Sequence, residues 1–101
     1  MSWSILLKYK DGEIEEIPFS CHSTFEEIWL PKIKELKLEL LLDIGLGAYP
    51  DLTKQELELL ILEINKLKEI AEEGPLKERL IFVISKLEKI IFEDYQWITF
   101  G

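Results

Sequence analysis

The chain of 101 residues has few of the side chains that build reactive centres. It contains one cysteine, one histidine, one methionine and one arginine. A single cysteine excludes an intrachain disulfide, and together with a single histidine it falls short of the four ligands of a structural zinc site. We therefore expect no metal site and no cofactor.

Positive charge is also scarce. The 12 basic residues face 20 acidic ones, which leaves a net charge of −8, and Arg79 is the only arginine. Nucleic acids and anionic membranes are bound by clustered lysines and arginines, so the composition argues against both partners. The acidic excess has two interpretations: it keeps the protein soluble, or it steers the protein toward a basic partner.

Long apolar runs are missing as well. No segment reaches the roughly 20 apolar residues that span a bilayer, and residues 1–4 lack the basic and apolar regions of a secretory signal. We expect a cytoplasmic protein. Hydrophobic residues make up 48% of the chain, which argues against disorder. The length predicts a single domain over residues 1–101.

Residues 3–9 alternate apolar and polar side chains, which predicts a strand. Asp11-Gly12 favours a hairpin turn, with a return strand over residues 13–19. A three-residue loop is favoured over a two-residue loop because it places apolar residues opposite each other on one face. The resulting pairs are Ile5 with Ile17 and Trp3 with Phe19.

The next element is a helix over residues 24–37. Ser23 with Glu26, or Thr24 with Glu27, fits a capping box. An apolar stripe continues in phase across Pro31, which predicts one kinked helix. A short helix, a break and a second turn that starts at Pro31 is the alternative.

Residues 38–44 carry conflicting signals. Leucine favours helices, but apolar residues alternate here with Glu39 and Asp43, which favours a strand. We predict a strand, ended by Gly45 and Gly47, and a loop that runs through Asp51.

Two antiparallel amphipathic helices follow, from about residue 54 to 74 and from 76 to 93. Thr53 and Glu56 form a capping box, and Gly74-Pro75 ends the first helix. These helices carry more apolar residues than one face needs, and the surplus residues are Leu59, Leu62, Phe82 and Phe92. Residues 95–100 predict a final strand.

The expected fold class is α+β, with the order β-β-α-β-α-α-β. The N-terminal hairpin and two further strands would share one sheet, packed by the kinked helix and the antiparallel helix pair.

Reactive chemistry has few candidates. Cys21 and His22 are adjacent, so in an extended segment their side chains point to opposite faces. A nucleophile and its base must lie within hydrogen-bond reach, so we expect a small buried cysteine and a loop histidine. Glutamates and lysines are mixed along the long helices, as on a solvated helix face. These glutamates are Glu58, Glu63, Glu69 and Glu88.

A small, acidic, single-domain α+β protein without catalytic groups is similar in type to many bacterial immunity proteins. The resemblance implies a protein that neutralises a toxin by masking its basic active site. We therefore expect a non-enzymatic module that binds a basic protein partner. The candidate partner-binding residues are Glu26, Glu27, Trp29, Asp43, Tyr49 and Asp51.

Two alternatives remain. The surplus apolar residues of the long helices could make an isologous homodimer with a structural or regulatory role. A small enzyme would instead bring Cys21 and His22 together with a carboxylate.

Overall fold

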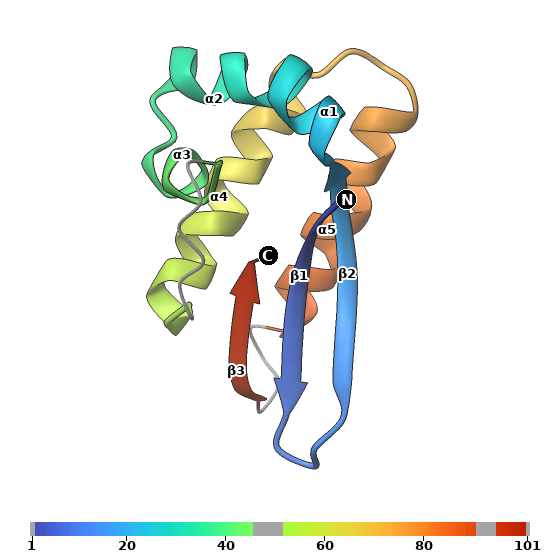
Figure 1. The fold of residues 1–101 in the computed structure, drawn as a ribbon, viewed down its shortest axis with the longest axis vertical. Coiled ribbons are helices and arrows are strands. Elements are labelled where there is room, and N and C mark those ends of the chain that lie inside the picture. Colours follow the sequence, from blue (N-terminus) through green and yellow to red (C-terminus); the bar gives the residue numbers. More distant parts are fainter. Residues whose placement is uncertain (1, 46–51, 91–94, 101) are drawn as a thin grey trace.

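A computed structural model describes residues 2–45, 52–90 and 95–100. It confirms the α+β fold class: helices pack on one antiparallel sheet, in which the first and last strands of the chain are neighbours (Figure 1). The elements are β1 (Ser2–Tyr9), β2 (Ile14–Cys21), α1 (His22–Thr24), η1 (Phe25–Trp29), α2 (Leu30–Leu36), α3 (Glu39–Gly45), α4 (Lys54–Ile70), α5 (Pro75–Ile90) and β3 (Tyr95–Phe100).

The sheet has the order β2-β1-β3. The hairpin loop has three residues, as expected, because the Tyr9 N–H donates to the Glu13 carbonyl at 2.9 Å. Gly12 adopts a φ of +95°, which other residues rarely adopt. Ile5 lies opposite Ile17, which confirms that pair. A bulge between Trp3 and Ser4 moves Trp3 opposite Ser20, so the expected pairing of Trp3 with Phe19 is wrong.

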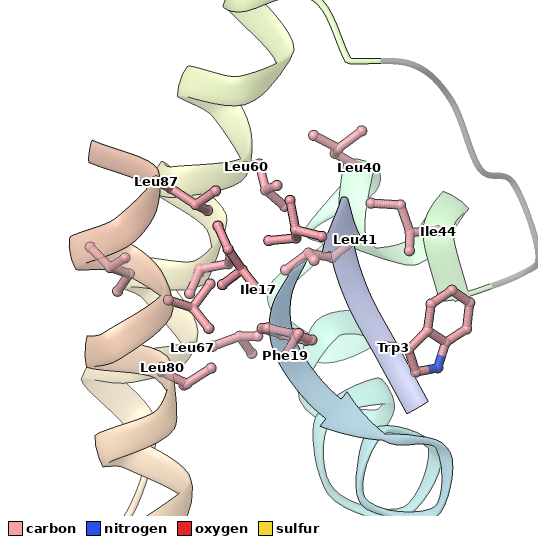
Figure 2. Close-up of a cluster of buried hydrophobic side chains, with 14 of the residues drawn as sticks. Trp3, Ile17, Phe19, Leu40, Leu41, Ile44, Leu60, Leu67, Leu80 and Leu87 are labelled. Atoms are coloured by element: carbon pink, nitrogen blue, oxygen red, sulfur yellow. The ribbon is translucent and has the colours of Figure 1, made fainter. Parts of the chain in front are cut away.

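Apolar side chains of β1, β2 and β3 point from one face of the sheet into a single core. Figure 1 shows α5 behind the strands, and none of the described helices lies in front of them. In Figure 2, Ile17 and Phe19 of β2 lie between Leu80 and Leu87 of α5 and the side chains of α3. No helix of the described residues therefore covers the opposite face of the sheet.

At each edge of the sheet, one backbone group cannot form a hydrogen bond with an additional strand. Pro18 lies in the edge strand β2, where it lacks the N–H that another strand would need. On the other edge, the Ile98 carbonyl of β3 accepts a hydrogen bond from the Leu52 N–H at 2.7 Å. An additional strand would meet an interrupted edge on either side.

Residues 39–45 form the helix α3, so the strand expected over residues 38–44 is wrong and the sheet has three strands. Leu38, Leu41 and Ile44 are buried at the three-residue spacing of a helix. The alternation of Leu38, Leu40, Leu42 and Ile44 with Glu39 and Asp43 fits a strand equally well over so short a segment. The helical propensity of leucine and a cap from α4, described below, favour the helix.

The helical run from His22 to Leu36 is continuous across Pro31, which confirms the helix and excludes the break. It contains the π-helical turn η1, in which the Leu30 N–H donates to the Phe25 carbonyl five residues earlier. A proline inside a helix clashes with the carbonyl four residues before it, and the wider π turn relieves that contact. The capping box expected at Ser23 or Thr24 is wrong, because the run starts at His22 and no side chain caps it.

The α4–α5 helix pair begins as expected. The Glu56 N–H donates to Thr53 Oγ1 and the Thr53 N–H donates to Glu56 Oε1, both at 3.1 Å. Helix α4 ends at Ile70, four residues before Gly74, and α5 starts at Pro75. Residues 71–74 thus form the connection between α4 and α5. Among the described helices, none is long and apolar enough to span a membrane.

Candidate functional site

A pocket of about 330 Å³ lies between the π turn and the α4–α5 connection. We call it the Trp29 pocket. One wall comes from Ile28, Trp29 and Lys32, and the other from residues 71–76. Trp29 lines the pocket but is only 2% exposed, because it is packed in the core. Ile28 and Leu76 are 36% and 38% exposed, and they add solvent-accessible apolar side chains to the lining of the pocket.

The rim of the pocket is acidic. Glu72 and Glu73 line it and are exposed. Glu73 Oε1 accepts a hydrogen bond from Lys77 Nζ at 2.7 Å, whereas the described residues give Glu72 no ion pair. Lys32 is the one cation among the lining residues. An apolar pocket with carboxylates at its mouth suits a ligand that joins an apolar group to a cation.

The six candidate partner-binding residues do not form one surface in the described structure. Glu26 and Glu27 are exposed in η1, directly before the pocket residue Ile28. Trp29 lies inside the pocket wall and not on the open surface. Asp43 is exposed on α3, which is a separate element. Tyr49 and Asp51 lie outside the described residues. The structure therefore brings Glu26, Glu27 and Trp29 to one segment.

Cys21 is exposed, so the expectation of a buried cysteine is wrong. Its thiol donates to Thr24 Oγ1 at 3.0 Å, and its Sγ lies 3.4 Å from Ser23 Oγ. Hydrogen bonding with the Ser23 and Thr24 side chains favours the thiolate and lowers the pKa of Cys21 to about 7. His22 instead places its ring 5.2 Å from the ring of Trp3. The partners of the thiol are thus the two hydroxyls.

Glu63 was expected on a solvated helix face, and that expectation is wrong: its residue is only 4% exposed. Its carboxylate caps α3, because the Leu41 N–H donates to Oε1 at 2.9 Å and the Leu40 N–H donates to Oε2 at 3.2 Å. Burial raises the pKa of Glu63, and these two hydrogen bonds oppose that shift. Glu63 therefore holds α3 against α4, and its role is structural.

The surplus apolar residues of the long helices are exposed in the structure. Leu59 and Leu62 are 42% and 53% exposed on α4, and Phe82 is 42% exposed on α5. Arg79 and Lys86 lie over the Phe82 ring, and Lys86 Nζ is 3.6 Å from Glu15 of β2. Lys86 thus contacts both the exposed Phe82 ring and the carboxylate of Glu15. Phe92 lies outside the described residues.

Metal ligands do not gather in residues 2–45, 52–90 and 95–100: no group of three or more histidine, cysteine, aspartate or glutamate side chains there is placed to hold an ion. None of the protein-family models, curated proteins or solved structures matches this chain.

Proposed function

We propose that this protein is a non-enzymatic binding module that docks a basic partner protein at the Trp29 pocket. The proposal rests on one observation above all, an apolar pocket whose mouth carries Glu72 and Glu73. Ligand pockets span roughly 300–1,000 Å³, so a pocket of about 330 Å³ suits one large apolar side chain. Interfaces commonly draw much of their binding energy from a single buried anchor of this kind.

Charge supports a basic partner. The pocket rim and the adjacent turn carry Glu26, Glu27, Glu72 and Glu73, whereas the nearby cations are Lys32 and Lys77. This local excess of negative charge has the same sign as the net charge of −8. Acidic surfaces of this kind accelerate encounters with cationic proteins, and repulsion between like charges disfavours acidic competitors.

The partner segment would present an apolar side chain flanked by lysine or arginine. A toxin neutralised by masking of its basic active site, in the manner of bacterial immunity proteins, meets this description. Such a role places the protein in the cytoplasm, where an unpaired cysteine stays reduced.

A defined peptide tests the recognition chemistry. An Arg-Trp-Arg peptide, titrated into the labelled protein and followed by NMR, should shift the amide signals of Lys32, Gly74 and Leu76. A Glu-Trp-Glu peptide of the same size is the matched control and should leave those signals in place. Equal shifts from both peptides would exclude charge selection at this pocket.

A pull-down from the native host tests the biological role. Wild-type bait and a Glu58→Lys control, altered on the exposed face of α4, should retain the same basic protein at low salt. A Glu72→Lys variant has the same net charge as the control but a less acidic pocket rim, and it should lose that protein. If the Glu72→Lys and Glu58→Lys baits retain the same proteins, the pocket is not the docking site.

A further inference from the structure

The face of the sheet turned away from the helices carries two cross-strand rows of side chains. Register places Ile14, Lys8 and Trp97 side by side in one row, and Glu16, Leu6 and Thr99 in the next. Their strand neighbours Ile5, Leu7 and Ile98 are fully buried on the helical side. Because successive side chains of a strand alternate between faces, the two rows lie on the outer face of the sheet, next to the pair of Ser4 and Pro18. Ser4 Oγ donates a hydrogen bond to Glu16 Oε1 at 2.8 Å.

This outer face is partly apolar and accessible. Ile14 is 64% exposed, and Leu6, Lys8, Trp97 and Thr99 are all half-buried. Figure 1 shows the same face in front of the strands, with α5 on the far side. A tryptophan and aliphatic residues without a helical layer are typical of a contact surface.

The charges of the outer face distinguish between partners. Two copies of a chain with a net charge of −8 repel each other over most of their surfaces. The two rows are neutral together, because they contain one lysine, Lys8, and one carboxylate, Glu16. Two copies can therefore meet here without like-charge repulsion between the contacting residues.

The pattern is also self-complementary. Lys8 and Glu16 lie in adjacent rows and on adjacent strands. A twofold axis that runs across the strands, between the two rows, places the Lys8 row of one copy over the Glu16 row of the other. Lys8 then lies beside Glu16 of the second copy, and the symmetry makes this pair twice. Sheets that stack face to face lie about 10 Å apart, within reach of two long side chains.

We propose that two copies of this chain dimerise by stacking the outer faces of their sheets, with Lys8–Glu16 pairs across the interface. The contact uses none of the residues that line the Trp29 pocket, so each copy in the dimer keeps its pocket open. The interface differs from one built on Leu59, Leu62 and Phe82, which lie on the helices.

Charge reversal combined with sedimentation equilibrium, from micromolar to millimolar protein, tests the interface. Wild-type protein should show a monomer–dimer equilibrium. Lys8→Glu and Glu16→Lys should each raise the dissociation constant by about tenfold, because two attractions become two repulsions. The double variant K8E/E16K should restore the wild-type value. Lys34→Glu and Glu35→Lys, on exposed positions of α2, match the net charges of the single variants and should leave the dimer unchanged.

Three outcomes would overturn the proposal. Wild-type protein could remain monomeric at millimolar concentration. A dimer could ignore both single reversals, which would place the interface elsewhere. The double variant could stay as weak as the single ones, which would show that Lys8 and Glu16 do not meet. Far-UV circular dichroism of each variant verifies that the monomer is folded.

Discussion

The buried carboxylate of Glu63 gives the sharpest prediction about stability. In a Glu63→Ala variant, the N–H groups of Leu40 and Leu41 lose their acceptor inside the protein. An unsatisfied buried donor costs about 1–3 kcal/mol, and two donors are affected. Removal of the carboxylate also removes its own desolvation cost, which offsets part of the loss. We expect the free energy of unfolding to fall by about 2–4 kcal/mol.

Urea unfolding at neutral pH, followed by circular dichroism, measures this loss by linear extrapolation. Glu58→Ala is the matched control, because Glu58 is exposed on the same helix. It should change stability by no more than about 0.5 kcal/mol. Glu63→Gln should fall between the two variants, because its amide keeps one acceptor oxygen and turns a donor toward the second N–H. If Glu63→Ala matches Glu58→Ala, water replaces the carboxylate and the cap contributes nothing.

The same carboxylate predicts an unusual pH dependence. Burial is the largest cause of the raised pKa of Glu63, and Glu39 adds to it, whereas the hydrogen bonds from Leu41 and Leu40 and the charge of Lys66 oppose it. A raised pKa favours the protonated form in the folded state. The protonated Glu63 side chain therefore contributes its full stabilisation below the ordinary pKa of 4.5. This stabilisation is lost as the pH rises through the raised pKa of the folded state. Wild-type protein should lose stability relative to Glu63→Gln over that window; a constant difference would contradict the raised pKa.

Three further predictions concern single positions. Alkylation of Cys21 by iodoacetamide should reach half its maximal rate near pH 7 in the folded protein, and Thr24→Val should move this midpoint to higher pH; a midpoint at the ordinary thiol value would exclude the hydroxyl effect. Thr53→Ala should destabilise the protein by about 1 kcal/mol in urea unfolding through loss of the N-cap of α4, and an unchanged midpoint would mean that the cap is dispensable. Gly12→Ala should cost about 1–2 kcal/mol in the same assay. A Cβ at Gly12 meets no atom within 4 Å, so the cost comes from its φ of +95° alone, and a neutral substitution would show that the loop adopts another conformation.

Features encoded within a few residues were predictable from the sequence. The capping box of Thr53 and Glu56, the hairpin loop at Gly12 and the continuous helix across Pro31 each depend on neighbours in the chain. Their energetics are local, so the residue types favour them strongly. Local signals were not always sufficient, because the capping box expected at Ser23 or Thr24 does not form. The π turn was not predictable, because several local arrangements relieve the strain at a proline.

Several features that depend on distant contacts were not predicted. Residues 38–44 fit both a strand and a helix, and the helix is held by Glu63, 22 residues from Leu41. The sequence pattern placed Glu63 on a solvated face, because its hydrogen-bond partners are backbone N–H groups. A pattern of charged residues gives no information about such partners. The Trp29 pocket likewise joins η1 to the connection after α4, so the sequence identified Trp29, Glu26 and Glu27 but not the rim formed by Glu72 and Glu73.

The interrupted edges of the sheet limit how large any assembly of this protein can become. Polymers of the cross-β kind grow when one strand after another adds to an open edge. Here Pro18 withholds a donor on one side, and the Leu52 amide occupies the Ile98 carbonyl on the other. Growth by strand addition is disfavoured in both directions, so a crowded solution of this chain should yield closed particles of fixed size and not fibrils.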